Sequence, residues 1–295
     1  MMIAQRMIGQ RIRTQRVLGS ALWLLTIVTA AVHASCPGEA SLAEAFPPGW
    51  GITAEGTRHV AADHTSINRS NVGNLSLKWV YRLNTSQPRS YPLVTEDTIF
   101  VGDGAAAVAL DRETGCERWR WGDAYGELGS GFLLHDDLLI FNIRPGFLIG
   151  LDARTGAERW RAQPGDNPAR MLSGTPALVD GRVLVPISSL EIGYPANFLY
   201  GCCATSGGLV SVDVTTGKDQ WVYNTIENPG SVVTGTRWRG LIDQRGPSGA
   251  PVWGSVSVDD ARGSAYVGTG QNYSHPTSGT SDAIISLNYR TGEPN

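Results

Sequence analysis

Two cysteines stand next to each other in this sequence, Cys202 and Cys203, and their spacing limits the chemistry open to them. Two more cysteines, Cys36 and Cys116, follow the first 34 residues, so three disulfide pairings are open. Neighbouring Cα atoms lie ~3.8 Å apart across a trans peptide, less than the roughly 4.4–6.8 Å that disulfides normally span. A bridge between neighbours is therefore strained, and strain tends to be kept at functional sites. The alternative is that Cys202 or Cys203 forms an ordinary structural bridge with Cys36 or Cys116.

Other signals of metal or haem chemistry are weak. The histidines show no zinc-ligand spacing; they are His33, His59, His64, His135 and His275. The 295 residues contain no Cys-x-x-Cys-His sequence, so no covalently attached c-type haem is expected in them. The net charge of −3 gives no electrostatic reason to expect nucleic acid or an anionic membrane as a partner.

The N-terminus has the pattern of an export signal. Arginines between Arg6 and Arg16 form a positive region, residues 17–32 are apolar, and Val32-His33-Ala34 offers small residues for cleavage after Ala34. The apolar stretch is short for a transmembrane helix. We predict a signal peptide over residues 1–34, a periplasmic mature domain over residues 35–295, and no membrane span in the mature chain. A retained N-terminal anchor is the alternative. Export makes disulfides possible.

The elements that position the cysteines are predicted to be β-strands. Glycine and proline are abundant, with 36 and 16 residues, which favours a turn-rich all-β protein over a helical one. A repeated motif supports this: an acid is followed by Thr-Gly and then by tryptophan at constant spacing. The three full copies begin at Asp111, Asp152 and Asp213 and end at Trp119, Trp160 and Trp221. A fourth copy begins at Asn288 and continues through Thr291-Gly292.

The physical chemistry of the motif predicts a turn between two strands. The acid can accept hydrogen bonds from the turn, and the glycine supplies the positive φ that the turn needs. The tryptophan then lies where it can wedge against a neighbouring sheet. Further strands are predicted before the motifs, at residues 98–102, 138–143, 182–187 and 264–268. Short antiparallel strands in such repeats are typical of β-propeller blades.

The distance between successive motifs grows along the chain because residues 190–207 and 227–251 are inserted between the later ones. Inserts on one face of a repeat array commonly carry the binding site. The alternative is that they are tolerated surface loops.

The repeat resembles the tryptophan docking motif of the pyrroloquinoline-quinone-dependent alcohol dehydrogenases. The stretches 246–253 and 266–274 are most similar to the polyvinyl-alcohol dehydrogenase branch of that family. The resemblance implies an eight-bladed ring, of which about four to five blades fit in this length. We therefore expect an incomplete propeller, because an open ring would expose sheet edges. The aspartate that serves as catalytic base in the family is expected beyond Asn295.

The resemblance also implies which residues contact the quinone. Ser173, Ser188 and Ser189 would donate hydrogen bonds to its carboxylates and carbonyls. Cys202 and Cys203 would form a vicinal bridge packed against the quinone ring, which leaves Cys36 and Cys116 as the second pair. Trp253 would stack on the opposite face of the ring. The alternative for Trp253 is a core residue that docks a blade.

A metal ion is implied at the edge of the quinone. Glu191 would ligate calcium, or another divalent or lanthanide ion, because a hard cation prefers carboxylate oxygen. Asn272 would add an amide oxygen, with Gln271 as the alternative. The alternative for Glu191 is a solvated acidic side chain on a loop, with no role in binding.

Two positions depart from the family pattern. An arginine is expected near Leu128, where Gly129 and Ser130 stand instead. The residues after the cysteine pair are Ala204-Thr205-Ser206-Gly207 in place of an aromatic residue, arginine and glycine. In the family such guanidinium groups commonly anchor the carboxylates of the quinone.

The implied function is the oxidation of an alcohol, secondary or polymeric, with electrons passed to a soluble or membrane cytochrome c. The main alternative is a non-enzymatic periplasmic scaffold like the outer-membrane assembly factors. Such scaffolds share the repeat but have no need of adjacent cysteines or of Glu191. A third alternative is a decayed propeller that binds a sugar or polymer.

Overall fold

The computed structural model describes Cys36, Ser41 and Leu42, residues 51–122, Ala124, residues 126–194, Asn197 and residues 199–295. The predicted signal peptide lies outside the described residues. The described chain is almost wholly β-strand and loop, with a few short 3-10 turns. No helix within these ranges has the length and apolar character needed to cross a membrane.

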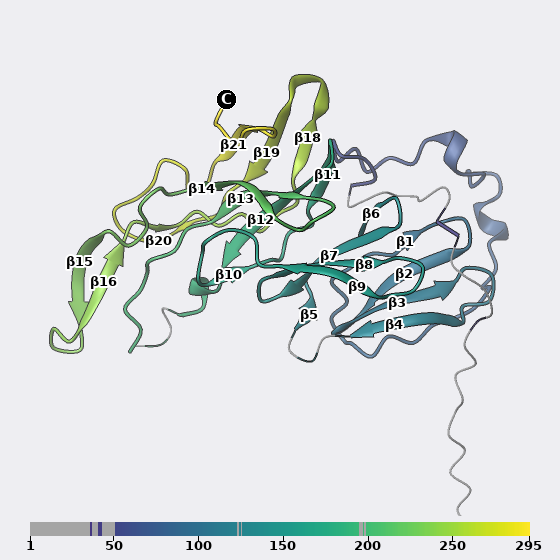
Figure 1. Cartoon of the computed structure of the whole chain (residues 1–295), viewed down its shortest axis with the longest axis horizontal. Helices are drawn as coiled ribbons and strands as arrows, with labels where there is room; N and C mark the ends of the chain where they lie inside the picture. Colours follow the sequence, from purple (N-terminus) through teal and green to yellow (C-terminus); the bar gives the residue numbers. More distant parts are fainter. Residues whose placement is uncertain are drawn as a thin grey trace, which may run out of the picture. The chain divides into compact units, whose positions relative to one another are not determined.

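Four antiparallel sheets follow one another along the chain (Figure 1). The first contains β1 (Leu93–Val94), β2 (Thr98–Asp103), β3 (Ala106–Asp111) and β4 (Glu117–Gly122). The second contains β5 (Glu127–Leu128), β6 (Leu133–His135), β7 (Leu138–Arg144), β8 (Phe147–Asp152) and β9 (Glu158–Ala162). The third contains β10 (Arg170–Met171), β11 (Ala177–Val179), β12 (Arg182–Ser189), β13 (Gly208–Asp213) and β14 (Asp219–Asn224). The fourth contains β18 (Ser257–Asp259), β19 (Ser264–Gly268) and β21 (Ile284–Asn288).

The four predicted strands are confirmed as β2, β7, β12 and β19. Each pairs antiparallel with the strand that leads into the repeated motif, so the strands of each sheet follow a meander in chain order, with β6, β11 and β20 (Asn272–Ser274) outside the main path. Four consecutive meanders of this kind form part of a β-propeller, as predicted.

The apolar cores lie between consecutive sheets. One core joins the first and second sheets through residues such as Phe100 and Phe141. The next joins the second and third sheets, with Ile140 against Val183, and another joins the third and fourth, with Leu209 and Leu287. Both faces of an inner sheet are therefore buried, which explains the nearly continuous apolar runs of β7 and β12.

The repeated motif forms the turn that its residue types predict. Asp111 Oδ1 accepts hydrogen bonds from the Thr114 backbone N–H at 2.8 Å and from the Thr114 hydroxyl at 2.7 Å. The following glycine, Gly115, has a φ of +74°. The turn at Asp213 repeats these hydrogen bonds to Thr216 at 2.8 Å each. The Thr114 hydrogen bond is the main cause that lowers the pKa of Asp111 below its ordinary value.

Each motif tryptophan packs on the Thr-Gly turn of the next sheet. The Trp119 indole N–H donates to the Ala153 carbonyl at 3.0 Å, and a side chain added at Gly156 would lie 2.8 Å from the Trp119 ring. Trp221 contacts Gly292 of the fourth sheet in the same way. The predicted wedge is confirmed. One further tryptophan, Trp79, lies outside the repeated motif and docks on the turn of the first sheet, a role that was not predicted.

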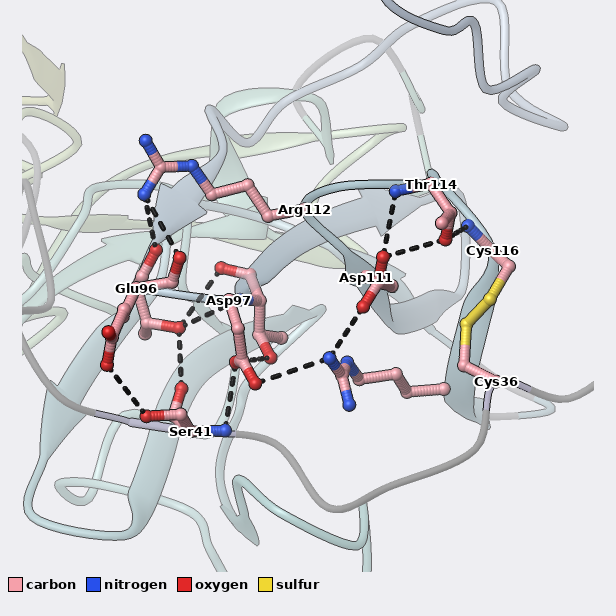
Figure 2. Close-up of polar contacts among 11 residues, drawn as sticks. Cys36, Ser41, Glu96, Asp97, Asp111, Arg112, Thr114 and Cys116 are labelled. Carbon is pink, nitrogen blue, oxygen red and sulfur yellow. Dashed lines mark hydrogen bonds and ion pairs between the residues drawn. A yellow bond between two sulfur atoms is a disulfide. The ribbon is translucent and has the colours of Figure 1, made fainter.

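The segment before the first sheet is bonded to it (Figure 2). Cys36 forms a disulfide with Cys116, at the turn that precedes β4. Farther along, the Ser41 backbone N–H donates to Asp97 Oδ1 at 2.9 Å, and the Ser41 carbonyl accepts from the Thr95 hydroxyl at 2.8 Å. One covalent bond and four hydrogen bonds thus fix Cys36 and Ser41 to the first sheet.

The two predicted inserts carry structure of their own. Residues 190–207 contain the 3-10 turn η3 (Leu190–Ile192). Residues 227–251 contain the hairpin of β15 (Val232–Arg237) and β16 (Ile242–Gly246), followed by β17 (Ser248–Gly249). β17 pairs with β20 (Asn272–Ser274), which brings the second insert beside the stretch around Asn272.

Candidate functional site

Cys202 and Cys203 form a disulfide with each other, so the predicted vicinal bridge is confirmed, together with the Cys36–Cys116 pair. The peptide between Cys202 and Cys203 is cis, and their Cα atoms lie 3.0 Å apart, not at the trans spacing assumed from the sequence. Both side chains are buried. Backbone hydrogen bonds to Arg245, at 2.8 and 3.0 Å, hold the pair beside β16.

Glu191 is fully buried next to this bridge, so the solvated-acid interpretation is wrong. Its Oε1 accepts from the Tyr200 hydroxyl at 2.6 Å and from the Ala204 N–H at 2.9 Å. Its Oε2 accepts from the Thr205 N–H at 2.8 Å and from the Thr205 hydroxyl. The carboxylate therefore ties η3 to the residues on both sides of the disulfide.

The two serines at the end of β12 lead into this cluster. Ser189 Oγ accepts from the Glu191 N–H at 3.1 Å, which caps η3, and lies 2.7 Å from Thr205 Oγ1. Ser188 is buried on the same strand. Serine is well suited to this strand end because its short side chain can bond the backbone of the following turn.

Asn272 lies on β20, and its amide oxygen is already used by its own loop. Asn272 Oδ1 accepts from the Ser281 hydroxyl at 2.6 Å and from the Ser278 N–H at 3.2 Å. The next residue, Tyr273, has a buried hydroxyl without a hydrogen-bond partner among the described residues. Burial raises the pKa of Tyr273, and the negative charge of Glu191 raises it further.

The fit of a metal ion to these residues is partial. Glu191 suits a hard cation, as a buried carboxylate beside hydroxyl oxygens. Its two oxygens nevertheless accept hydrogen bonds from Tyr200, Ala204 and Thr205, and Asn272 Oδ1 is held by Ser278 and Ser281. Within the described ranges, no three His, Cys, Asp or Glu side chains converge on one point.

Ser173 and Trp253 line a second feature, a cavity of about 360 Å³. The Trp253 side chain is 62% exposed, so the interpretation of Trp253 as a core docking residue is wrong. Ser173 Oγ is buried, and no described group bonds to it. Arg58, Arg89 and Ser130 also line this cavity, and none of them was singled out as a ligand contact from the sequence.

Backbone hydrogen bonds join the stretches on which the predicted residues stand. The Val252 N–H donates to the Ile187 carbonyl at 3.0 Å, so the segment of Trp253 runs beside the end of β12. The Gly249 N–H donates to the Thr205 carbonyl at 3.0 Å, and the Ala250 N–H donates to the Gln271 carbonyl at 3.0 Å. The structure thus brings the predicted stretches together, although the cavity lining does not include the cysteines, Glu191 or Asn272.

Comparison with known proteins agrees with this geometry. The family model described as "Outer membrane protein assembly factor BamB" matches residues 69–274. A polyvinylalcohol dehydrogenase of Pseudomonas sp. is 29% identical over 255 residues, which cover 83% of this chain and 39% of the relative. The dehydrogenase subunit of a quinone alcohol dehydrogenase from Gluconacetobacter polyoxogenes is 26% identical, covering 87% of this chain and 39% of the relative. The chain therefore spans about 39% of the length of these relatives.

Solved structures confirm the fold. The quinohemoprotein alcohol dehydrogenase from Comamonas testosteroni superposes with a TM-score of 0.67 at 23% identity, over 85% of this chain and 40% of that one. A europium-containing methanol dehydrogenase gives a TM-score of 0.64 at 20% identity, over 85% and 48% of the two chains. The chain belongs to the propeller family of the matching model, and it resembles the quinone-dependent alcohol dehydrogenases within that fold.

Proposed function

We propose that this chain binds pyrroloquinoline quinone and forms part of an enzyme that oxidises an alcohol. The observation that carries the proposal is the vicinal disulfide Cys202–Cys203, packed beside the buried Glu191. Hydrogen bonds from the Gly249 N–H to the Thr205 carbonyl and from the Val252 N–H to the Ile187 carbonyl connect this cluster to the segment of the exposed Trp253. The similarity to polyvinylalcohol dehydrogenases supports the substrate class.

Each residue has a role that follows from its surroundings. Trp253 offers an exposed indole wall on which a flat, electron-poor ring can stack. Ser173 Oγ lacks a partner and can donate to a carboxylate or carbonyl of the ligand. Ser188, Cys202 and Cys203 are buried and would supply the other contacts to the quinone. When bound, the quinone supplies the two-electron acceptor for alcohol oxidation.

Glu191 is the proposed ligand for calcium or another divalent or lanthanide ion. A cation here would take the place of hydrogen-bond donors such as the Tyr200 and Thr205 hydroxyls, which can rotate and present their oxygens. Asn272 would join the ligand set only after its oxygen leaves Ser278 and Ser281. Glu191 is therefore the stronger part of the metal proposal.

The activity of the whole protein is part of the same proposal. The substrate would be a secondary or polymeric alcohol, and the electrons would pass to a cytochrome c. A periplasmic location accords with two disulfides among the described residues, because disulfides persist in oxidising compartments.

A scaffold role is the second candidate, and the description of the matching family model favours it. A scaffold needs the docked sheets but does not need an exposed indole over a cavity that contains an unpaired hydroxyl. These two features favour the quinone.

Titration of pyrroloquinoline quinone into the purified, non-reduced chain tests the proposal, with equilibrium dialysis as the measurement. We expect saturable binding that strengthens with calcium, and a loss of about tenfold in affinity for Trp253→Ala. Trp238→Ala is the matched control, because this exposed tryptophan lies between β15 and β16 and outside the cavity lining. Absence of binding by the parent chain, with or without calcium, would leave the scaffold as the better function.

A further inference from the structure

The cavity that contains Trp253 and Ser173 is lined by residues from loops that lead into strands of all four sheets. Arg89, Ser130, Ser173 and Trp253 each precede, by three or four residues, a strand of a successive sheet: β1, β6, β11 and β18. They therefore occupy similar positions in successive repeats. A volume of about 360 Å³ falls within the roughly 300–1,000 Å³ of small-molecule sites.

The charged side chains in the described part of this cavity lining are positive. Its charged members among the described residues are Arg58 and Arg89, both on exposed side chains, and its remaining polar groups are hydroxyls and backbone. Ser173 adds a buried hydroxyl that lacks a partner. Two guanidinium groups, a hydroxyl and an indole wall suit a flat ligand that carries several carboxylates.

The positions where the family pattern places its arginines are closed to a long side chain here. A Cβ at Gly129 would overlap the carbonyl oxygen of Leu172, and Leu128 is buried in the core between the first two sheets. Thr205 and Ser206, which lie in the stretch after the cysteine pair where the family pattern has its other arginine, are also buried. The cation must therefore come from elsewhere, and Arg89 is the residue at the corresponding position of the preceding repeat.

The backbone holds both arginines in place. Ser90 Oγ accepts from the Gly102 N–H at 3.0 Å, which fixes the residue after Arg89 against β2. The Arg58 N–H donates to the Gly51 carbonyl at 2.7 Å, which closes a turn. This turn is attached to the fourth sheet, because the Val258 N–H donates to the Ala54 carbonyl at 2.8 Å.

We infer that Arg89 and Arg58 are the anchors for the carboxylates of the quinone, in place of the two arginines of the family pattern. This inference rests on the proposed function and assigns two binding residues to it. Arg89 stands in the loop before β1 and Arg58 in the turn that is bonded to the fourth sheet, so the two guanidiniums would select for negative charge at separated points of one molecule.

The test compares pyrroloquinoline quinone with its trimethyl ester, in which the carboxylates are neutral. Affinities are measured by equilibrium dialysis for the parent chain, Arg89→Gln, Arg58→Gln and the control Arg69→Gln, an exposed arginine outside the lining. We expect each cavity variant to bind the acid about tenfold or more weakly, because hydrogen bonds to charged groups are the strong ones. The same variants should bind the ester like the parent, and Arg69→Gln should match the parent for both ligands.

The outcomes separate the inference from the proposed function. If the parent binds the acid and the cavity variants bind it equally well, the anchor assignment is overturned while the quinone function stands. Equal weakening for acid and ester would show a structural role and would also overturn the assignment. A parent that binds neither ligand overturns the proposed function, and the anchors with it.

Discussion

Tyr200 lies two residues before the vicinal disulfide, and its hydroxyl donates to Glu191 Oε1 at 2.6 Å. Burial and this hydrogen bond raise the pKa of Tyr200, so the tyrosine keeps its proton and is the donor of the bond. The conformation of the first insert thus depends on one buried negative charge.

Removal of that charge should destabilise the fold. Glu191→Ala leaves donors from Tyr200, Ala204 and Thr205 without their acceptor in a buried place, and we expect a loss of about 3 kcal/mol in the free energy of unfolding. Urea denaturation measures the change. Glu113→Gln, an exposed carboxylate paired with Lys78, is the control and should change stability by less than about 0.5 kcal/mol. A Glu191→Ala variant as stable as the control would contradict the assigned contacts.

The disulfide pattern is directly measurable. Proteolysis of the unreduced protein followed by mass mapping should recover one peptide with the Cys202–Cys203 bridge and a cross-linked pair joined by Cys36 and Cys116. Peptides that join Cys36 to Cys202 or Cys203 would refute the structure of this region.

The tryptophan docking contact can be separated from glycine's backbone freedom. Gly156 and Gly181 both have positive φ, at +75° and +68°, but only at Gly156 would a side chain meet the Trp119 ring. Gly181→Ala should cost about 1 kcal/mol for the left-handed backbone alone. Gly156→Ala should cost about 1–3 kcal/mol more, because the added methyl overpacks the docking contact. Thermal unfolding of both variants measures the difference, and equal losses would argue against docking.

Acid should weaken the turns of the repeat. Hydrogen bonds from Thr114 and Thr216 lower the pKa values of Asp111 and Asp213 below the ordinary value near 3.8. A carboxyl whose folded pKa is lowered contributes stability that is present above its unfolded pKa and lost as pH falls through the folded value. We therefore expect stability to decline below about pH 4.

A double variant checks the origin of that decline. Asp111→Asn with Asp213→Asn should lose less stability between pH 7 and pH 3 than the parent, as measured by urea denaturation at the two pH values. Asparagine keeps an acceptor for the turn, since Asn288 accepts from the Thr291 and Arg290 backbone N–H groups in the fourth copy. An unchanged pH dependence in the double variant would assign the acid sensitivity to other groups.

The repeat made most of the fold predictable. The Asp-Thr-Gly turn depends on neighbouring residues only, and strand alternation is a local pattern, so β2, β7, β12 and β19 could be located from the sequence. The vicinal bridge followed from the resemblance. The role of Trp79 was less accessible, because its docking partner Gly115 belongs to a sheet that begins after it.

The site was harder to predict because its contacts cross between repeats. Arg58 and Arg89 carry no local motif, and their place at the cavity follows only from how the sheets pack. Asn272 matched the family pattern, yet whether its oxygen is available depends on how its own loop folds back to place Ser278 and Ser281. Tyr273 gave one signal, as an aromatic residue next to a predicted ligand, but the burial of its unpartnered hydroxyl required the structure.

The convergence of four sheets on one cavity has a thermodynamic consequence. Because Arg89, Ser130, Ser173 and Trp253 stand in loops that lead into strands of four different sheets, the cavity exists only while all four sheets are docked. A ligand that fills it binds this docked arrangement and has no equivalent site on separated sheets. Its binding free energy therefore adds to the cooperativity of the whole array, by about 2.7 kcal/mol at a hundredfold excess over its dissociation constant. Ligand binding in the cavity should therefore stabilise the docked sheets, and sheets that are more stably docked should bind the ligand more tightly.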